Sequence, residues 1–146
     1  MVKMPRFVSA VVLCLLILAG CGALRTYKLN EAFPEPTDPK TLLPLYDAVT
    51  VTRTEDGASV TLTAVEAEPL LLTFENIVCT REKAQGMNGA YTVTFVMTDP
   101  AAQKPTLVIG EVTGGAASVF EIGGWRYAAF DEAVDLAALI HLFPDA

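Results

Sequence analysis

Residues 91–98 read YTVTFVMT, and this stretch decides the fold class of the chain. Apolar side chains at the odd-numbered positions 91–97 alternate with threonines at 92, 94 and 98, which is typical of a strand with one buried face. Asn88-Gly89 precedes the run and Asp99-Pro100 follows it, and both pairs favour turns. We therefore expect a strand of an antiparallel sheet here.

Other runs show the same alternation or the same enrichment in valine and threonine. An aspartate-glycine pair separates the first two of these runs and predicts a hairpin, and glycine pairs separate the last three. The runs cover residues 49–52, 60–62, 106–112, 117–122 and 125–129.

Residues 68–77 break the alternation. Leu70, Phe74 and Ile77 have helical spacing, and Pro69 is acceptable in a first turn. The apolar run at 70–74 also fits a buried strand, so both alternatives stay open.

The C-terminal residues predict a second helix. Asp131 is a candidate N-cap, and Pro144 would end the helix. Between them, apolar side chains lie at helical spacing at Ala133, Leu136, Ile140 and Phe143.

These elements predict an α+β fold. We expect an antiparallel meander of about five to seven short strands, with one internal helix and a C-terminal helix packed on one face. The layout is similar to small, functionally obscure surface lipoproteins of Gram-positive bacteria, a resemblance of architecture that implies no site residues.

The N-terminus has the pattern of an export signal. Lys3 and Arg6 precede an apolar run at 7–19, which suits the core of a signal peptide and is too short to span a bilayer. The remainder of the chain carries eight basic and seventeen acidic residues, a formal charge of −9. This balance disfavours nucleic acids and anionic lipid headgroups as partners.

Leu18-Ala19-Gly20-Cys21 follows the apolar run and resembles the lipobox of bacterial lipoproteins. The resemblance covers the first 21 residues and implies cleavage between Gly20 and Cys21, with lipid on the Cys21 thiol. It also implies attachment to the extracytoplasmic face of the cell membrane, since two acyl chains give stable anchoring.

The predicted organisation has three parts. Residues 1–20 form the signal peptide, residues 21–44 the lipidated cysteine and a proline-rich tether, and residues 45–146 a single α+β domain. Four prolines between positions 34 and 44 predict an extended segment that would lift the domain from the bilayer.

No catalytic motif is evident. Ser59 and Ser118 lack a nucleophile-elbow setting, and the single histidine, His141, fits a helix end better than catalysis. Cys79 is expected to be a buried thiol, although a Cys79–His141 pair stays open. We predict no catalytic residues, no metal site and no cofactor, and we lean away from an enzyme.

Trp125 and Tyr127 form the candidate interaction patch, because a strand places them on one face. The alternative is that both cover the core. We expect a membrane-anchored, non-enzymatic module that binds an envelope protein or peptide. The rival hypothesis is a small envelope-acting hydrolase or an inhibitor-like module.

Overall fold

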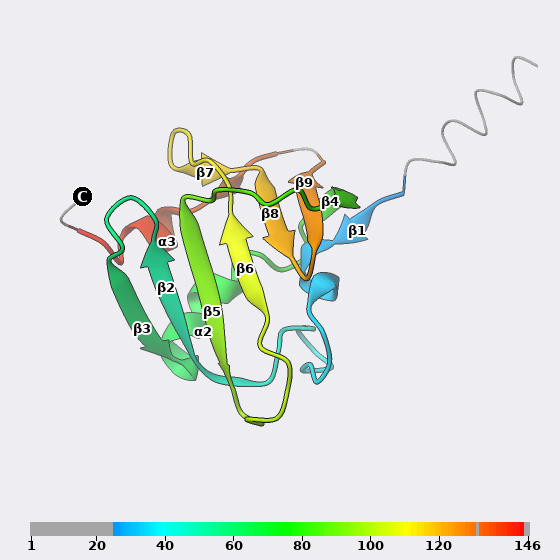
Figure 1. The fold of residues 1–146 in the computed structure, drawn as a ribbon, viewed down its shortest axis with the longest axis vertical. Helices are drawn as coiled ribbons and strands as arrows, with labels where there is room; N and C mark the ends of the chain where they lie inside the picture. Colours follow the sequence, from blue (N-terminus) through cyan, green and yellow to red (C-terminus); the bar gives the residue numbers. More distant parts are fainter. Residues whose placement is uncertain (1–24, 131, 145–146) are drawn as a thin grey trace, which may run out of the picture.

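The computed structural model describes residues 25–130 and 132–144. The predicted signal peptide, the cleavage site at Gly20 and Cys21, and the expected N-cap Asp131 lie outside the described residues. The expected α+β fold is confirmed: an antiparallel sheet carries helices on one side (Figure 1).

The main sheet has eight strands in the order β1-β4-β9-β8-β6-β5-β2-β3. We expected about five to seven strands, and the two-residue β1 is too short to show alternation in the sequence. The strands are β1 (Tyr27–Lys28), β2 (Tyr46–Arg53), β3 (Ser59–Thr63), β4 (Val78–Lys83), β5 (Tyr91–Met97), β6 (Thr106–Ile109), β8 (Val119–Ile122) and β9 (Trp125–Ala129).

The alternation at 91–97 has the expected structural meaning. Tyr91, Val93, Phe95 and Met97 are buried, whereas the residues between them are partly or fully exposed. β5 pairs with β2 on one side and with β6 on the other, so it lies inside the sheet. The predicted hairpin around Gly57 is also present, because β2 pairs with β3 from Ala48↔Thr63 to Thr52↔Ser59.

The internal helix, α2 (Ala64–Leu72), starts four residues before the predicted 68–77 segment. Thr63 and Glu66 form a capping box that fixes this start, with Glu66 N donating to Thr63 Oγ1 over 3.3 Å. Pro69 therefore lies inside the helix and not in its first turn, where we had placed it. Leu70 and Leu71 are buried beneath the sheet.

The C-terminal helix is shorter than the expected 131–143. Val134–Asp135 forms β10, which pairs with β7 (Ala116–Ala117) as a separate two-stranded sheet, and α3 covers only Ala137–Ile140. The predicted helix is wrong in its first residues, because strand pairing with a distant segment overrides the helical spacing of Ala133 and Leu136.

The expected tether is mostly part of the folded domain. β1 pairs with β4, and the 3-10 helix η1 (Leu29–Ala32) places the fully buried Leu29 in the core. Phe33 is 7% exposed and packs edge-to-face on Phe95 at 5.3 Å. The prolines of this segment suggested an extended chain, but the buried side chains of Leu29, Phe33 and Leu43 hold residues 27–44 against the sheet.

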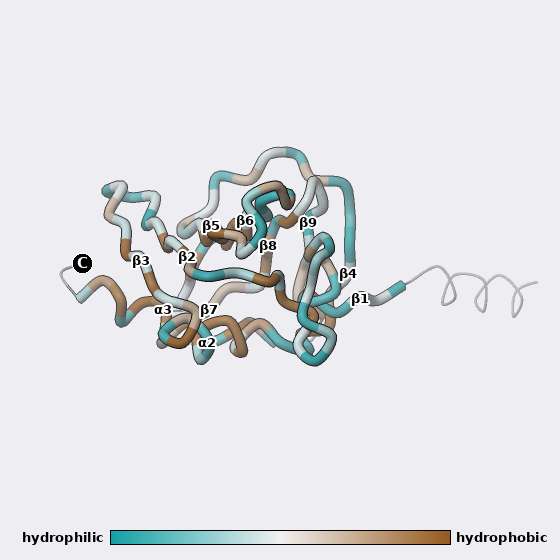
Figure 2. Tube along the Cα trace, turned by 90° about the horizontal axis from the view of Figure 1, so that it is seen from below, coloured by the Kyte–Doolittle hydropathy of each residue, from teal (hydrophilic) through white to brown (hydrophobic). Residues whose placement is uncertain are grey.

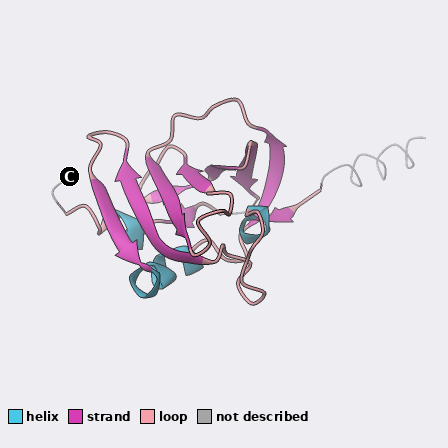
Figure 3. Ribbon diagram, turned by 60° about the horizontal axis from the view of Figure 1, so that its bottom comes forward, coloured by secondary structure: helices cyan, strands magenta, loops and turns pink. Residues whose placement is uncertain are grey.

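The core lies between the sheet and the elements beneath it. Figure 2 shows the strands arching over α2, α3 and β7, with the hydrophobic residues gathered under the arch. Figure 3 shows the same helices on one side of the strongly curved sheet. In the described part of the chain, no helix is long and apolar enough to cross a membrane.

Candidate functional site

The structure separates the two residues of the predicted interaction patch. Trp125 is 40% exposed, whereas Tyr127 is 3% exposed and belongs to the core. Burial raises the pKa of Tyr127, which the nearby Arg81 guanidinium partly opposes. Only Trp125 is therefore accessible to a partner, and the alternative core interpretation holds for Tyr127.

Trp125 belongs to a different cluster. The Arg81 guanidinium carbon lies 4.2 Å from the centre of the Trp125 ring and 4.1 Å from that of Tyr27. Arg25 lies over the Tyr27 ring at 5.3 Å. Arginine and aromatic side chains thus alternate along the β1–β4–β9 end of the sheet. Sequence reasoning missed this stack, because nothing local indicates that β1 and β9 flank β4.

Cys79 and His141 lie in different parts of the fold. Cys79 is fully buried on β4, and burial raises the pKa of its thiol to about 11. His141 directly follows α3. Two residues later, Phe143 packs against Arg53 of β2 and Tyr91 of β5, which places this segment beside those strands. Three strands separate β5 from β4 in the sheet order, so the two side chains do not form a catalytic pair.

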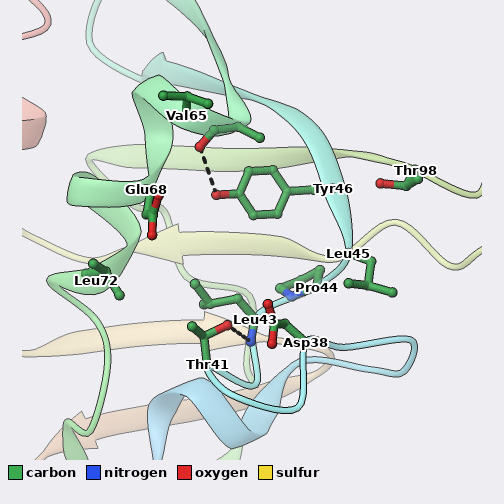
Figure 4. A pocket seen from close by; sticks show the side chains of 11 residues that line it. Asp38, Thr41, Leu43, Pro44, Leu45, Tyr46, Val65, Glu68, Leu72 and Thr98 are labelled. Atoms are coloured by element: carbon green, nitrogen blue, oxygen red, sulfur yellow. Dashed lines mark hydrogen bonds between the residues drawn. The ribbon is translucent and has the colours of Figure 1, made fainter.

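A hollow of about 300 Å³ lies beside α2, and we call it the α2 pocket (Figure 4). It opens between the helix, the first residues of β2 and the loop that precedes β2. Its lining residues are Asp38, Thr41, Leu43, Pro44, Leu45, Tyr46, Ala64, Val65, Glu68, Leu72 and Thr98.

A closed loop forms one wall of the α2 pocket. Asp38 N donates to Leu43 O over 2.8 Å, and Leu42 N donates to Asp38 O over 2.8 Å. Leu42 has a φ of 61°, in the left-handed region that a leucine rarely adopts. Buried Asn30 supports the loop from below, since its Nδ2 donates to Thr41 O over 3.0 Å. The wall is therefore fixed by main-chain hydrogen bonds and by the Asn30 side chain.

Tyr46 spans the pocket from β2 towards the start of α2 (Figure 4). Its hydroxyl donates to Ala64 O over 3.5 Å. Burial raises the pKa of Tyr46, and the charge of Glu68 raises it further. Tyr46 and Glu68 both line the pocket.

Exposed apolar side chains surround the opening. Val65 is 81% exposed, Leu45 44% and Leu72 40%. Asp38 and Glu68 add two carboxylates, one from each side. Apolar side chains that are exposed together around one hollow, unlike single exposed ones, are typical of binding sites. The arrangement can therefore hold an apolar group and place a cation beside it.

Other hollows offer less to a ligand. One of about 490 Å³ runs along residues 73–78 and 132–135, and one of about 460 Å³ lies near Arg53 and Glu111. Three exposed apolar side chains line the α2 pocket, whereas the first of these hollows has one, Val78 at 41% exposure, and the second has none. In residues 25–130 and 132–144, no three or more histidine, cysteine, aspartate or glutamate side chains are placed to hold a metal ion.

Sequence reasoning missed the α2 pocket. Leu45 marked the start of the domain, and Glu68 was placed at a helix start. The capping box at Thr63 was the signal that would have put Val65, Glu68 and Leu72 on one helix. The comparisons add no function: the chain matches no family model, no curated protein and no solved structure.

Proposed function

We propose that this protein is a lipid-anchored, extracytoplasmic binding module whose α2 pocket takes a peptide segment of an envelope protein. The anchor rests on the resemblance of Leu18-Ala19-Gly20-Cys21 to a lipobox. In this proposal, lipid on Cys21 holds the protein at the cell membrane. The binding role rests on the α2 pocket.

The single observation that carries the binding role is the ring of exposed apolar side chains around the pocket. Burying Val65, Leu45 and Leu72 under a partner would remove apolar surface from water, which favours association. A pocket of about 300 Å³ lies at the lower end of the size range of small-molecule sites and suits one side chain of a peptide.

The two carboxylates at the pocket opening favour a ligand segment that carries positive charge. Asp38 and Glu68 lie on opposite sides of the opening, and the described ion pairs are made by other residues. A lysine or arginine next to an apolar residue in the ligand would satisfy both features of the pocket. The exposed position of Glu68 favours electrostatic attraction over the buried, proton-transferring role that a hydrolase would require.

Site-specific photo-crosslinking in native cells tests the binding role. A photoreactive phenylalanine at Val65 should give a discrete adduct. The same group at Phe130, which is 48% exposed just after β9 and lines none of the described hollows, is the matched control and should give none. Equal adducts at both positions would contradict a specific site beside α2.

Charge reversal then tests the ligand's chemistry. Glu68→Lys should reduce the Val65 adduct by about tenfold or more, because like charges across an interface are strongly unfavourable. Glu55→Lys makes the same change in the exposed β2–β3 turn and should leave the adduct unchanged. An adduct that survives Glu68→Lys would show that the ligand is not basic.

A further inference from the structure

The described fold brings the domain close to the proposed anchor. This inference rests on the proposed lipid at Cys21. β1 begins at Tyr27, six residues after that cysteine. A chain spans at most about 3.3–3.6 Å per residue, so the reach from Cys21 to β1 is about 20 Å. The β1 end of the sheet must therefore lie near the bilayer surface.

Basic residues gather at this end of an acidic protein. Of the eight basic residues after Cys21, four lie on β1, β4 and β9, and a fifth, Arg25, lies two residues before β1. One acidic residue, Glu82, lies on these three strands. The five are Arg25, Lys28, Arg81, Lys83 and Arg126.

Three of the five share one face with two aromatic residues. Lys83 lies directly opposite Trp125 in the β4–β9 register, and side chains of directly opposed residues share a face. Arg81 stacks between Trp125 and Tyr27, and Arg25 covers the other part of Tyr27. We call Arg25, Tyr27, Arg81, Lys83 and Trp125 the arginine–aromatic surface.

Glu82 does not neutralise this surface. It alternates with Arg81 and Lys83 along β4, so its side chain lies on the opposite face. There it pairs with Arg126 over 3.5 Å. The arginine–aromatic surface thus carries three positive charges from the described residues and no carboxylate.

The net charge of −9 acts only weakly at this surface, because most acidic residues lie outside its three strands. Charges separated by more than a Debye length, about 8 Å at physiological ionic strength, are largely screened from one another. Basic side chains near an anionic bilayer attract it, and tryptophan and tyrosine rings favour the headgroup region. The surface has the composition of a membrane-contact face.

We propose that the arginine–aromatic surface rests on anionic phospholipid headgroups of the bilayer that holds the Cys21 lipid. The domain is then held against the membrane and not lifted by a tether. The α2 pocket belongs to the other end of the sheet, because α2 packs on β2 and β3 (Figure 1). Contact through β1, β4 and β9 would leave the pocket open to a partner.

Trp125 is the only tryptophan in the chain, so its fluorescence reports on this surface alone. The mature lipidated protein is reconstituted into vesicles of phosphatidylcholine or of equal parts phosphatidylcholine and phosphatidylglycerol. In the anionic vesicles we expect Trp125 emission at shorter wavelength and a loss of acrylamide quenching. High salt should reverse both changes.

Paired variants identify the residues responsible. Arg81→Gln with Lys83→Gln should abolish the difference between the two vesicle types. Lys40→Gln with Lys104→Gln removes the same charge from exposed positions elsewhere and should preserve it. Each variant is compared with itself in the two vesicle types, because loss of Arg81 alters the surroundings of Trp125. Lys83→Gln alone, which leaves the stack intact, should weaken the response.

Mass spectrometry of the same samples separates the two proposals. If Cys21 carries lipid and Trp125 responds equally to both vesicle types, the membrane contact is overturned and the anchor stands. If Cys21 carries no lipid, the proposed anchor fails and this inference fails with it. A response to soluble polyphosphate but not to anionic vesicles would assign the surface to a soluble polyanion and overturn the lipid contact.

Discussion

Replacing Phe33 with alanine tests whether residues 27–44 belong to the folded domain. Phe33 is 7% exposed and packs on Phe95 with ring centres 5.3 Å apart. Removal of a buried phenylalanine side chain costs about 3–5 kcal/mol, from lost apolar burial and from the cavity that remains. For a domain of this size, that loss lowers Tm by about 10 °C or more.

Urea unfolding followed by circular dichroism measures the difference in the free energy of unfolding. Phe130→Ala is the matched control, because Phe130 is 48% exposed and its truncation should cost below about 1 kcal/mol. If residues 27–44 were a tether outside the fold, Phe33→Ala and Phe130→Ala would lower the free energy of unfolding by the same small amount. If Phe33→Ala also costs below about 1 kcal/mol, the assignment of the proline-rich segment to the core is refuted.

Three further outcomes follow from local interactions. Arg53 and Ala58 N donate to the Asp56 carboxylate, and its pKa falls from 3.8 to about 2. The stabilisation that Asp56 provides is therefore present above about pH 4 and is lost as the pH falls towards 2, so acid titration should destabilise Asp56→Asn less than the wild type. Thr63→Ala removes the N-cap of α2 and should cost about 1 kcal/mol in urea unfolding. Because the Cys79 thiol is buried and its pKa is raised to about 11, it should react with a disulfide reagent at neutral pH much more slowly in the folded than in the urea-unfolded protein.

The sequence predicted those strands that have alternating apolar residues or glycine turns of their own. β9 has the expected bounds, at 125–129, and β5 ends at Met97, one residue before the end of the expected 91–98 strand. In β5 every second residue is buried, and the sequence shows this as alternating apolar side chains. In β9 only Tyr127 is buried, and the glycine pair before it marks its start. The fold class followed from these runs.

The errors occurred where contacts between distant residues decide the structure. Leu29 and Phe33 are isolated apolar residues near prolines, and only their contacts across the fold make them core. Val134 joins a strand because Ala117 pairs with it. Local propensity cannot report such pairings.

The candidate sites were harder to predict for the same reason. Trp125 was named with Tyr127 as a candidate interaction patch, but its neighbours Arg81 and Tyr27 come from strands that the sequence does not place beside it. The α2 pocket needs the loop at 38–45, α2 and Thr98 together. No single segment carries that signal.

The most direct test of the anchored binding module is the covalent state of Cys21 in cells. Metabolic labelling with a fatty acid, followed by mass spectrometry of the N-terminal peptide, should show a mature chain that begins at a diacylglyceryl-modified Cys21. Cys21→Ala should abolish the label. A mature protein with an unmodified Cys21, or a label that persists in Cys21→Ala, would contradict the account.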